Sequence, residues 1–217
     1  MFDSTKPVAG LFDMDGVIIN TESQYTVFWA DIMQKYKGDA SLAARVKGTT
    51  LDNIYETWFH GQTAVQDKIT VALDDFETTM EMPYVPGFLR FAVNLKENGI
   101  KIAIVTSSNK LKMDAVYCQH PELKELFDRI LTAELFTRSK PFPDCYLLGA
   151  QVFNTVPGNC IVFEDSFNGL QAGCAAGMHV IGLSTTNPSD SIKEYTDIVI
   201  PDFKKMTYTN LCKPLLA

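Results

Sequence analysis

The 217-residue sequence predicts an α/β fold: a parallel sheet flanked by helices, with a small helical domain inserted near the N-terminus. Three observations lead to this prediction. Short apolar segments bounded by polar or turn residues are typical of strands that are buried on both faces of a parallel sheet. Helical patterns lie between these segments, and strands that alternate with helices indicate βαβ units. One long interval, residues 20–84, carries helical patterns only.

The strands are predicted from short apolar segments. The three most convincing are "VAGLF" (8–12), "IKIAIVT" (100–106) and "CIVF" (160–163). Three weaker candidates are "VIGL" (180–183), "DIVI" (197–200) and "DRILTA" (128–133). Helical patterns between them cover residues 86–98, 109–118, 143–153 and 166–176. We expect Ser166 to cap the start of the last helix and Gly177 to cap its end, because these residue types favour those positions.

The interval without strands contains several amphipathic helical patterns, "ESQYTVFWADIMQKY", "TLDNIYETWFHG" and "QDKITVALDDFETTMEM". The segment "IINTE" would lead into this helical part, and "MPYVPGF" (82–88), with its two prolines, would lead back. We therefore expect two domains. Residues 1–19 and 85–217 would form the core, and residues 20–84 the helical domain.

Composition narrows the class of protein. The formal net charge of −7 disfavours nonspecific binding to nucleic acid or anionic membranes, and no apolar run is long enough to span a bilayer. The five cysteines form no CxxC pair and have no histidine at zinc spacing, and the N-terminus lacks a signal-peptide pattern. We expect a cytoplasmic protein with reduced thiols that binds neither nucleic acid nor membranes and is a monomer rather than an oligomer.

Polar side chains follow each of the three strongest strands. In open α/β sheets, ligands bind beyond the carboxyl ends of the strands, so residues that follow different strands converge at one edge. The three groups are Asp13-Met14-Asp15-Gly16, Thr106-Ser107-Ser108-Asn109 and Glu164-Asp165-Ser166. This convergence is far more specific than any of the short segments alone.

The chemistry of these groups suits a metal and a phosphate. Two ionised carboxylates about 4 Å apart repel by roughly 4 kcal/mol at an effective dielectric constant near 20, which a cation would offset. Clustered carboxylate oxygens are hard ligands that suit Mg²⁺. The hydroxyls of Thr106 and Ser107, and N–H groups at a helix start, can donate to phosphoryl oxygens. Lys140 in "RSKPFPD" (138–144) is the candidate positive charge, although its spacing does not place it at the site.

The chain resembles the haloacid dehalogenase superfamily and, within it, the β-phosphoglucomutase-like phosphatase subgroup. The resemblance covers nearly the whole chain and rests on four motifs in order, "FDMDGV" (12–17), "VTSSN" (105–109), "SKPFPD" (139–144) and "VFEDSFNGLQAGCAAGM" (162–178). It implies a Rossmann-like core with a small helical cap of the C1 type inserted after the first motif. The interval 20–84 matches that placement.

The resemblance also implies roles for individual residues. Asp13 aligns with the nucleophile that forms an aspartyl-phosphate, and Asp15 with the general acid/base. Thr106 aligns with the phosphate-binding hydroxyl, and Lys140 with the lysine that neutralises nucleophile and phosphate. Asp165 aligns with a Mg²⁺ ligand.

Other candidates complete the implied site. Asp13 and the backbone carbonyl of Asp15 would also bind the metal, and Glu164 would be either a further ligand or its hydrogen-bonding support. Ser107 and Asn109 are candidates for substrate binding, together with Gly48 in the cap segment "VKGTTLDNI".

The leading expectation is a Mg²⁺-dependent phosphatase of a small phosphorylated metabolite such as a sugar phosphate. A β-phosphoglucomutase-like mutase is an alternative, but mutases carry a cap arginine where this chain has Leu51, and a histidine where it has Tyr25. Arg45 or Lys47 could substitute for that arginine. A pyrophosphatase and a non-catalytic sensor of phosphorylated metabolites are further alternatives.

Overall fold

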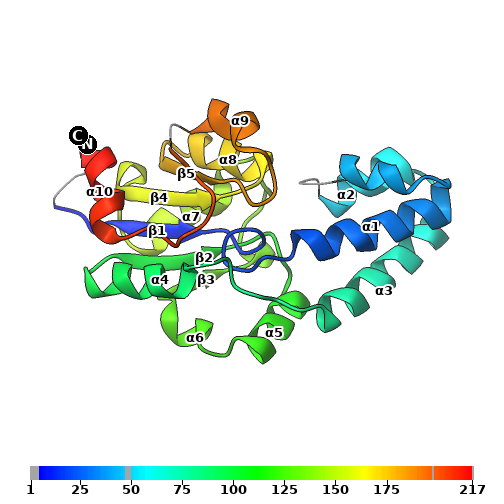
Figure 1. Ribbon diagram of the computed structural model, residues 1–217, viewed down its shortest axis with the longest axis horizontal. Coiled ribbons are helices and arrows are strands. Elements are labelled where there is room, and N and C mark those ends of the chain that lie inside the picture. Colours follow the sequence, from blue (N-terminus) through cyan, green and yellow to red (C-terminus); the bar gives the residue numbers. More distant parts are fainter. Residues whose placement is uncertain (1–4, 47–49, 197, 217) are drawn as a thin grey trace.

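A six-stranded, entirely parallel sheet forms the centre of the larger part of the molecule (Figure 1). The computed structural model describes residues 5–46, 50–196 and 198–216. The strand order is β3-β2-β1-β4-β5-β6. All six predicted strands are present, and the predicted α/β fold class is confirmed. The strands are β1 (Ala9–Phe12), β2 (Lys101–Val105), β3 (Arg129–Leu131), β4 (Cys160–Glu164), β5 (His179–Leu183) and β6 (Ile198–Ile200).

Strand β1 lies in the middle of the sheet, which explains its wholly apolar sequence. It pairs with β2 on one side and β4 on the other, and each of its residues is buried. Phe12, its last residue, lies opposite Ile104 of β2 and Phe163 of β4. The residues that follow these three strands therefore emerge together at one edge of the sheet.

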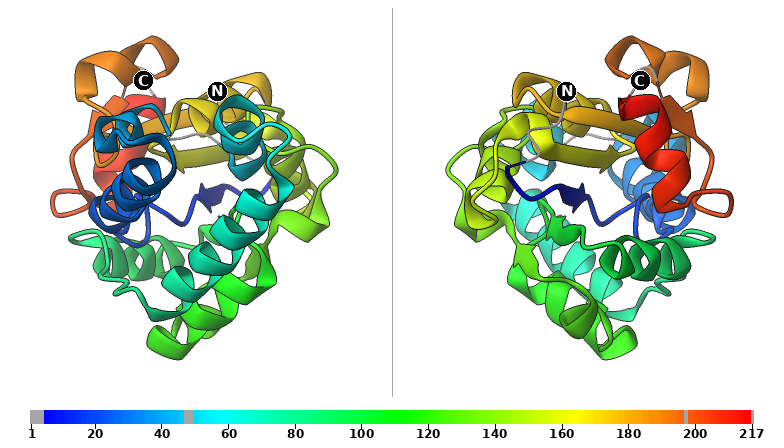
Figure 2. Two further views of the ribbon diagram at one scale, coloured as in Figure 1. Left: turned by 90° about the vertical axis from the view of Figure 1, so that its right-hand side faces the viewer. Right: turned by 90° about the vertical axis from the view of Figure 1, so that its left-hand side faces the viewer.

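Helices cover both faces of the sheet, as the two end-on views show (Figure 2). No helix within the described part of the chain is long and apolar enough to cross a membrane. Ser166 caps helix α8 (Phe167–Ala175) as predicted, because its Oγ accepts the Gly169 N–H at 3.1 Å. The predicted cap at Gly177 is wrong by one residue: Ala176 is the C-cap, and Gly177 follows with a φ of 71°. The helices of the core are α4 (Phe88–Glu97), α5 (Lys110–Gln119), α6 (Leu123–Leu126), α7 (Asp144–Val152), α8 (Phe167–Ala175), α9 (Ser189–Ile192) and α10 (Tyr208–Leu216).

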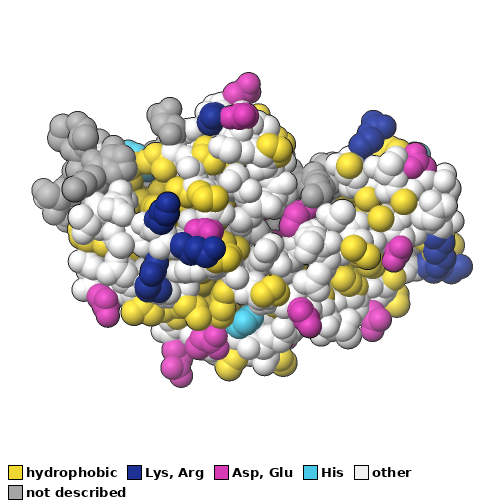
Figure 3. All heavy atoms as spheres, in the orientation of Figure 1, with side chains coloured by type: hydrophobic (Ala, Val, Ile, Leu, Met, Phe, Trp, Pro, Cys, Tyr) yellow, Lys and Arg dark blue, Asp and Glu magenta, His cyan; other side chains and the backbone are white. Residues whose placement is uncertain are grey.

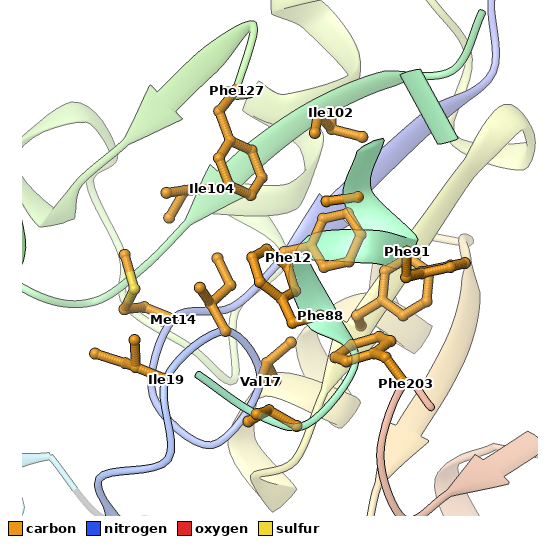
Figure 4. Close-up of a cluster of buried hydrophobic side chains, with 14 of the residues drawn as sticks. Phe12, Met14, Val17, Ile19, Phe88, Phe91, Ile102, Ile104, Phe127 and Phe203 are labelled. Carbon is orange, nitrogen blue, oxygen red and sulfur yellow. The ribbon is translucent and has the colours of Figure 1, made fainter. Parts of the chain in front are cut away.

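Alternation along the strands sends side chains into two separate apolar layers. Leu11 packs with residues of α7 and α8 on one face. Phe12 points to the other face, where α4, α5 and α10 pack. Its ring stacks on Phe163 at a centroid distance of 4.3 Å. It meets the rings of Phe88 and Phe91 edge-on (Figure 4). These layers hold the end of β1, and therefore Asp13, in a fixed position.

The region without predicted strands is helical and has an apolar cluster of its own. It contains α1 (Glu22–Lys37), a short 3₁₀ helix, η1 (Ala40–Arg45), α2 (Leu51–Trp58) and α3 (Thr63–Thr79). We call these elements the cap helices; they extend from the carboxyl edge of the sheet (Figure 1). Their cluster is built around Trp29, Met33, Ile54, Phe59 and Ile69. This cluster packs the cap helices against one another.

The two segments that join the cap helices to the core run side by side. Asn20 donates its N–H to the carbonyl of Pro83 at 2.7 Å, and Val85 donates to Ile18 at 2.9 Å. An antiparallel bridge links Ile19 with Tyr84. The entry and return segments expected from the sequence therefore form one paired connection next to the carboxyl edge of the sheet.

Candidate active site

The chain turns sharply after β1, and Gly16 permits the turn. Its φ is +72°, in the left-handed region that residues with a side chain rarely adopt. A Cβ atom at this position would lie 1.9 Å from Oδ2 of Asp165. The turn closes where the Gly16 N–H donates to the carbonyl of Ile19 at 2.7 Å. It brings the segment that carries Asp13 and Asp15 into close contact with the end of β4.

Lys140 joins two of the predicted site carboxylates. Its Nζ donates to Oδ1 of Asp13 and Oε1 of Glu164, at 2.6 Å each, and to the carbonyl of Val105 at 3.2 Å. The residue is only 7% exposed. Burial by itself lowers the pKa of Lys140, but Asp13 and Glu164 outweigh it and raise that pKa, so the ammonium stays charged. The positive charge that the sequence could not place is therefore at the end of β1.

Glu164 lies behind the site and uses both of its oxygens. Oε1 accepts from Lys140 and from the Tyr146 hydroxyl, the latter at 2.8 Å. Oε2 accepts from the N–H groups of Asp165 and Ser166, at 3.0 and 3.1 Å, and from the Ser166 hydroxyl at 3.1 Å. The residue is completely buried, and a Cβ at Gly169 would overlap it. Five donors already occupy this carboxylate, which favours a supporting role over direct metal ligation.

Three carboxylates are close enough to hold one metal ion. Asp13, Glu164 and Asp165 each offer an oxygen, and these oxygens lie within 4.8 Å of one another. Burial, partly opposed by Lys140, raises the pKa of Asp13 to about 7. Burial, followed by the charges of Glu164 and Asp13, also raises the pKa of Asp165 well above its usual value. One lysine does not neutralise these three carboxylates, two of which are buried, so the donor set and its charge fit a hard divalent cation.

Asp15 has a different environment from Asp13. Its Oδ1 accepts from the Thr21 hydroxyl at 2.7 Å. Its Oδ2 accepts from Lys112 Nζ and, at 3.4 Å, from the Ser108 hydroxyl. The side chain is 31% exposed and lines a cavity. The two aspartates, with only Met14 between them, are therefore held by separate sets of partners.

Four residues of this network were not predicted as site residues from the sequence: Thr21, Lys112, Tyr25 and Glu77. Lys112 Nζ also donates to the Tyr25 hydroxyl at 2.6 Å, and this hydroxyl donates to Glu77 Oε1 at 2.6 Å. Lys112 has a weak sequence signal, because it shares a helix face with the buried Met113 and Val116. The sequence singles out Tyr25 only as the residue that stands where mutases carry a histidine, and nothing distinguishes Glu77 from the other polar residues of the cap helices.

The other predicted substrate-binding residues follow β2. Thr106 is 2% exposed, and its Oγ1 accepts the Ser108 N–H at 3.0 Å, which leaves the hydroxyl proton able to donate. Asn109 caps α5 by accepting the Lys112 N–H at 2.9 Å. Thr106, Ser107 and Asn109 all line the cavity. Gly48 lies outside the described residues.

The cavity measures about 430 Å³ and lies between the strand ends and the cap helices. The core contributes Asp13, Asp15, Lys140 and Asp165 to its lining. On the face in Figure 3, no lysine or arginine among the described side chains is visible where the two parts meet. The cap side of the lining is apolar, hydroxylated and acidic: Glu22, Tyr25, Thr26, Trp29, Ala43, Val46, Thr50, Leu51, Ile54, Thr70, Leu73, Asp74 and Glu77.

Curated proteins of known sequence match most of the length of this chain. A "probable pseudouridine-5'-phosphatase" of Saccharomyces cerevisiae is 34% identical over 203 residues, 82% of this chain and 84% of that protein. Hexitol phosphatase B of Escherichia coli is 28% identical over 222 residues, 97% of each chain. Protein SUPPRESSOR OF QUENCHING 1, chloroplastic, of Arabidopsis thaliana is 28% identical over 92% of this chain, which spans only 20% of that protein.

Solved structures share the fold. An Entamoeba histolytica haloacid dehalogenase hydrolase of family IA, variant 3, superposes with a TM-score of 0.85 at 21% identity, over 97% of this chain and all of that one. A Clostridium difficile β-phosphoglucomutase gives 0.74 at 23% identity, over 97% of each chain. At these identities the likeness concerns the fold alone.

A family model settles the classification. The model described as haloacid dehalogenase-like hydrolase matches residues 11–183, a span that begins within β1 and ends with β5. This span includes all four sequence motifs, and the predicted resemblance is confirmed. The chain belongs to the haloacid dehalogenase-like hydrolase family.

Proposed function

We propose that the protein is a Mg²⁺-dependent phosphatase that hydrolyses a small phosphorylated metabolite through an aspartyl-phosphate on Asp13. One observation carries the proposal. Asp13 is held by Lys140 at 2.6 Å beside the buried carboxylates, whereas Asp15, two residues on, faces the cavity with partners of its own. A nucleophile and an acid/base need such unlike environments.

The first chemical step forms the covalent intermediate. An oxygen of Asp13 attacks phosphorus, and the bond between phosphorus and the leaving oxygen breaks. Asp15 donates its proton to that oxygen, which departs as an alcohol. Lys140 and the Thr106 hydroxyl stabilise the charge on the transferring phosphoryl group.

The second step releases phosphate. Asp15, now ionised, takes a proton from a water molecule whose oxygen attacks phosphorus. The bond between Asp13 and phosphorus breaks, which regenerates both aspartates in their starting forms. The net reaction consumes one water and yields an alcohol and inorganic phosphate.

The carboxylates of Asp13 and Asp165 and the backbone carbonyl of Asp15 would hold the metal. Bound there, Mg²⁺ would offset the charge of the substrate phosphate and of the nucleophile. Glu164 would orient this set through Lys140 and the backbone N–H of Asp165. This assignment gives every buried carboxylate of the cluster a partner.

The lining of the cavity supports a phosphatase rather than a bisphosphate mutase. A mutase needs a cation to hold the second phosphate. Lys140 and Lys112, the two cations in the described lining, are each paired with carboxylates. Of the two possible substitutes for the mutase arginine, Arg45 has its guanidinium 5.0 Å from the centroid of the Trp58 ring and does not line the cavity. Lys47 lies outside the described residues. An acidic, hydroxylated cap wall suits a neutral sugar or polyol leaving group, and two of the compared relatives are named as phosphatases.

The proposed activity predicts phosphate release from monophosphate esters whose sugar, polyol or nucleoside part carries no charge. Phosphate release is measured with Mg²⁺ and a panel of hexitol, hexose and nucleoside monophosphates. We expect kcat/KM for these esters to be at least tenfold higher than for a bisphosphate, or for a sugar acid phosphate of equal length. A carboxylate placed near the acidic wall is repelled and loses at least about 1.4 kcal/mol of binding in the transition state. Conversion of glucose 1-phosphate to glucose 6-phosphate without phosphate release would contradict the proposal. Release from inorganic pyrophosphate alone would contradict it equally.

Metal binding should stabilise the fold in a pH-dependent way. Mg²⁺ at a hundred times its dissociation constant should add about 2.7 kcal/mol to the free energy of unfolding, which raises Tm by roughly 5–10 °C. The pKa of Asp13 is raised to about 7 and that of Asp165 lies well above its usual value, and the metal needs both carboxylates ionised. Affinity should therefore fall as the pH decreases, by up to about tenfold per pH unit for each carboxylate that takes up a proton.

Differential scanning fluorimetry with Mg²⁺ or EDTA, from pH 5 to 8, measures this effect. Asp165→Asn should abolish the shift in Tm. Asp190→Asn, whose side chain is 90% exposed and paired with Lys193, should leave it unchanged. A shift that survives in Asp165→Asn would rule out this metal site.

A further inference from the structure

Lys112 is a buried ammonium group that the proposed chemistry does not yet use. Its side chain is 5% exposed, and its Nζ contacts three polar groups from three segments of the chain. One is the Asp15 carboxylate after β1. The others are the Tyr25 hydroxyl on α1, at 2.6 Å, and Glu77 Oε1 on α3, at 4.0 Å.

The backbone of Lys112 is anchored in the core, whereas two of its side-chain partners belong to the cap helices. Its N–H is bonded to the Asn109 cap of α5, and its neighbour Met113 is buried against the sheet. On the cap side, Tyr25 packs edge-on against Phe76 at a centroid distance of 5.4 Å. The ammonium therefore lies at the contact between core and cap, where it meets Asp15.

Lys112 is not available for a second anionic group of a substrate. An ammonium has three donors, and here a carboxylate, a phenol hydroxyl and a second carboxylate surround it. Tyr25 and Glu77 are also bonded to each other at 2.6 Å, so they form one unit on the cap side. An arrangement of this kind fixes the place of the ammonium, and with it the Oδ2 atom of Asp15.

We propose that Lys112 is a positioning residue that orients the Asp15 carboxylate toward the leaving oxygen, and that Tyr25 and Glu77 of the cap hold Lys112 in place for this task. The inference rests on the proposed function, because it concerns the proton-transfer step of that reaction. It adds that the cap contributes to proton transfer through Lys112, as well as enclosing the substrate. Misplacing a general acid removes part of a contribution that is typically 10²- to 10⁴-fold in rate.

The test compares two leaving groups. An alkyl phosphate needs a proton on its leaving oxygen, whereas p-nitrophenyl phosphate releases a stable phenolate without one. The constant kcat/KM covers the steps up to departure of the leaving group, so it reports on this proton. We expect Lys112→Met to lower kcat/KM about 10²-fold for a hexitol or hexose phosphate and less than about tenfold for p-nitrophenyl phosphate.

Two further variants sharpen the test. Tyr25→Phe removes one hydroxyl and keeps the ring, and we expect a smaller loss, about tenfold for the alkyl phosphate, with the same bias between substrates. Lys110→Met makes the same change at an exposed position of the same helix and should leave both constants unchanged. In the double variant with Asp15→Asn, Lys112→Met should add little further loss, because the two residues act on one step.

The outcomes separate the inference from the proposed function. Equal losses for the two substrates in Lys112→Met would overturn the positioning role. So would additive losses in the double variant, or a loss confined to KM. If Asp15→Asn shows no bias between alkyl and aryl phosphates, the assignment of Asp15 as the acid fails, and the inference fails with it. If Asp15→Asn shows the bias and Lys112→Met does not, the inference fails alone.

Discussion

Asp13→Asn is expected to lower kcat/KM for every phosphate ester by about 10⁴-fold or more, the size of loss seen when a covalent nucleophile is removed. The substitution keeps the shape of the side chain, and the amide oxygen can still accept from Lys140, which now lies 2.6 Å from Asp13 Oδ1. The amide cannot attack phosphorus. Phosphate release under Mg²⁺ measures the effect.

Folding and binding serve as controls for this variant. Circular dichroism and the unfolding midpoint should show an intact fold, and Asp190→Asn on the exposed surface should keep full activity. Alkyl and aryl phosphates should lose activity to a similar extent, unlike in Lys112→Met. Turnover within about tenfold of the unaltered protein would refute the role of Asp13 as nucleophile.

Lys140→Met is expected to destabilise the metal-free protein by about 3–5 kcal/mol, the usual effect of breaking a buried ion pair from one side. The change leaves Asp13 and the fully buried Glu164 without their cation. For a chain of this length, the loss lowers Tm by on the order of 10 °C. Denaturant unfolding in EDTA measures it, because bound metal would mask part of the loss. Catalysis should be lost as well.

A second substitution tests whether charge is the cause. In the Lys140→Met background, Glu164→Gln should restore part of the stability, because it removes one of the unpaired charges. In the unaltered protein the same Glu164→Gln change should be destabilising. Lys193→Met, which breaks an exposed pair with Asp190, should change the free energy of unfolding by less than about 1 kcal/mol. An unchanged midpoint in Lys140→Met would contradict the electrostatic account.

The parts of the site that follow strands were predictable from the sequence. Asp13 and Thr106 come directly after a buried strand, and Asp165 follows Glu164 at the end of another; the carboxyl ends of neighbouring parallel strands meet at one edge of the sheet. The apolar runs are unambiguous because β1 and β4 are buried on both faces. Local sequence therefore determined both the strands and the convergence of these side chains.

Other parts depend on contacts between segments that are distant in the sequence. Lys140 does not follow a strand, so its contact with Asp13 could be taken only from the family resemblance. The side of the site formed by Tyr25, Glu77 and Lys112 depends on how α1 packs against α3 and α5. The Tyr25–Glu77 bond joins residues 52 positions apart, and the Lys112–Tyr25 bond joins residues 87 positions apart. Asn109 was predicted as a substrate ligand. Its side chain also caps α5, and a role toward substrate stays a prediction.

The glutamate of the fourth motif illustrates a choice that the sequence left open. Glu164 could be a metal ligand or a support, since both roles require the same residue next to Asp165. The structure gives its oxygens five donors from Lys140, Tyr146, Asp165 and Ser166. Those donors come from the loop before α7, from α7 itself and from the turn between β4 and α8, and only their packing reveals that the carboxylate is already occupied.

The central claim is that phosphate passes through a covalent bond to Asp13. Asp15→Asn should slow the second step, which needs a base to activate water, while an aryl phosphate can still complete the first. We therefore expect a burst of p-nitrophenol of about one equivalent per protein. Mass spectrometry of the acid-quenched protein should find one phosphoryl group on the peptide that contains Asp13. A steady release of p-nitrophenol without a burst, and an unmodified Asp13 peptide at every quench time, would contradict the account.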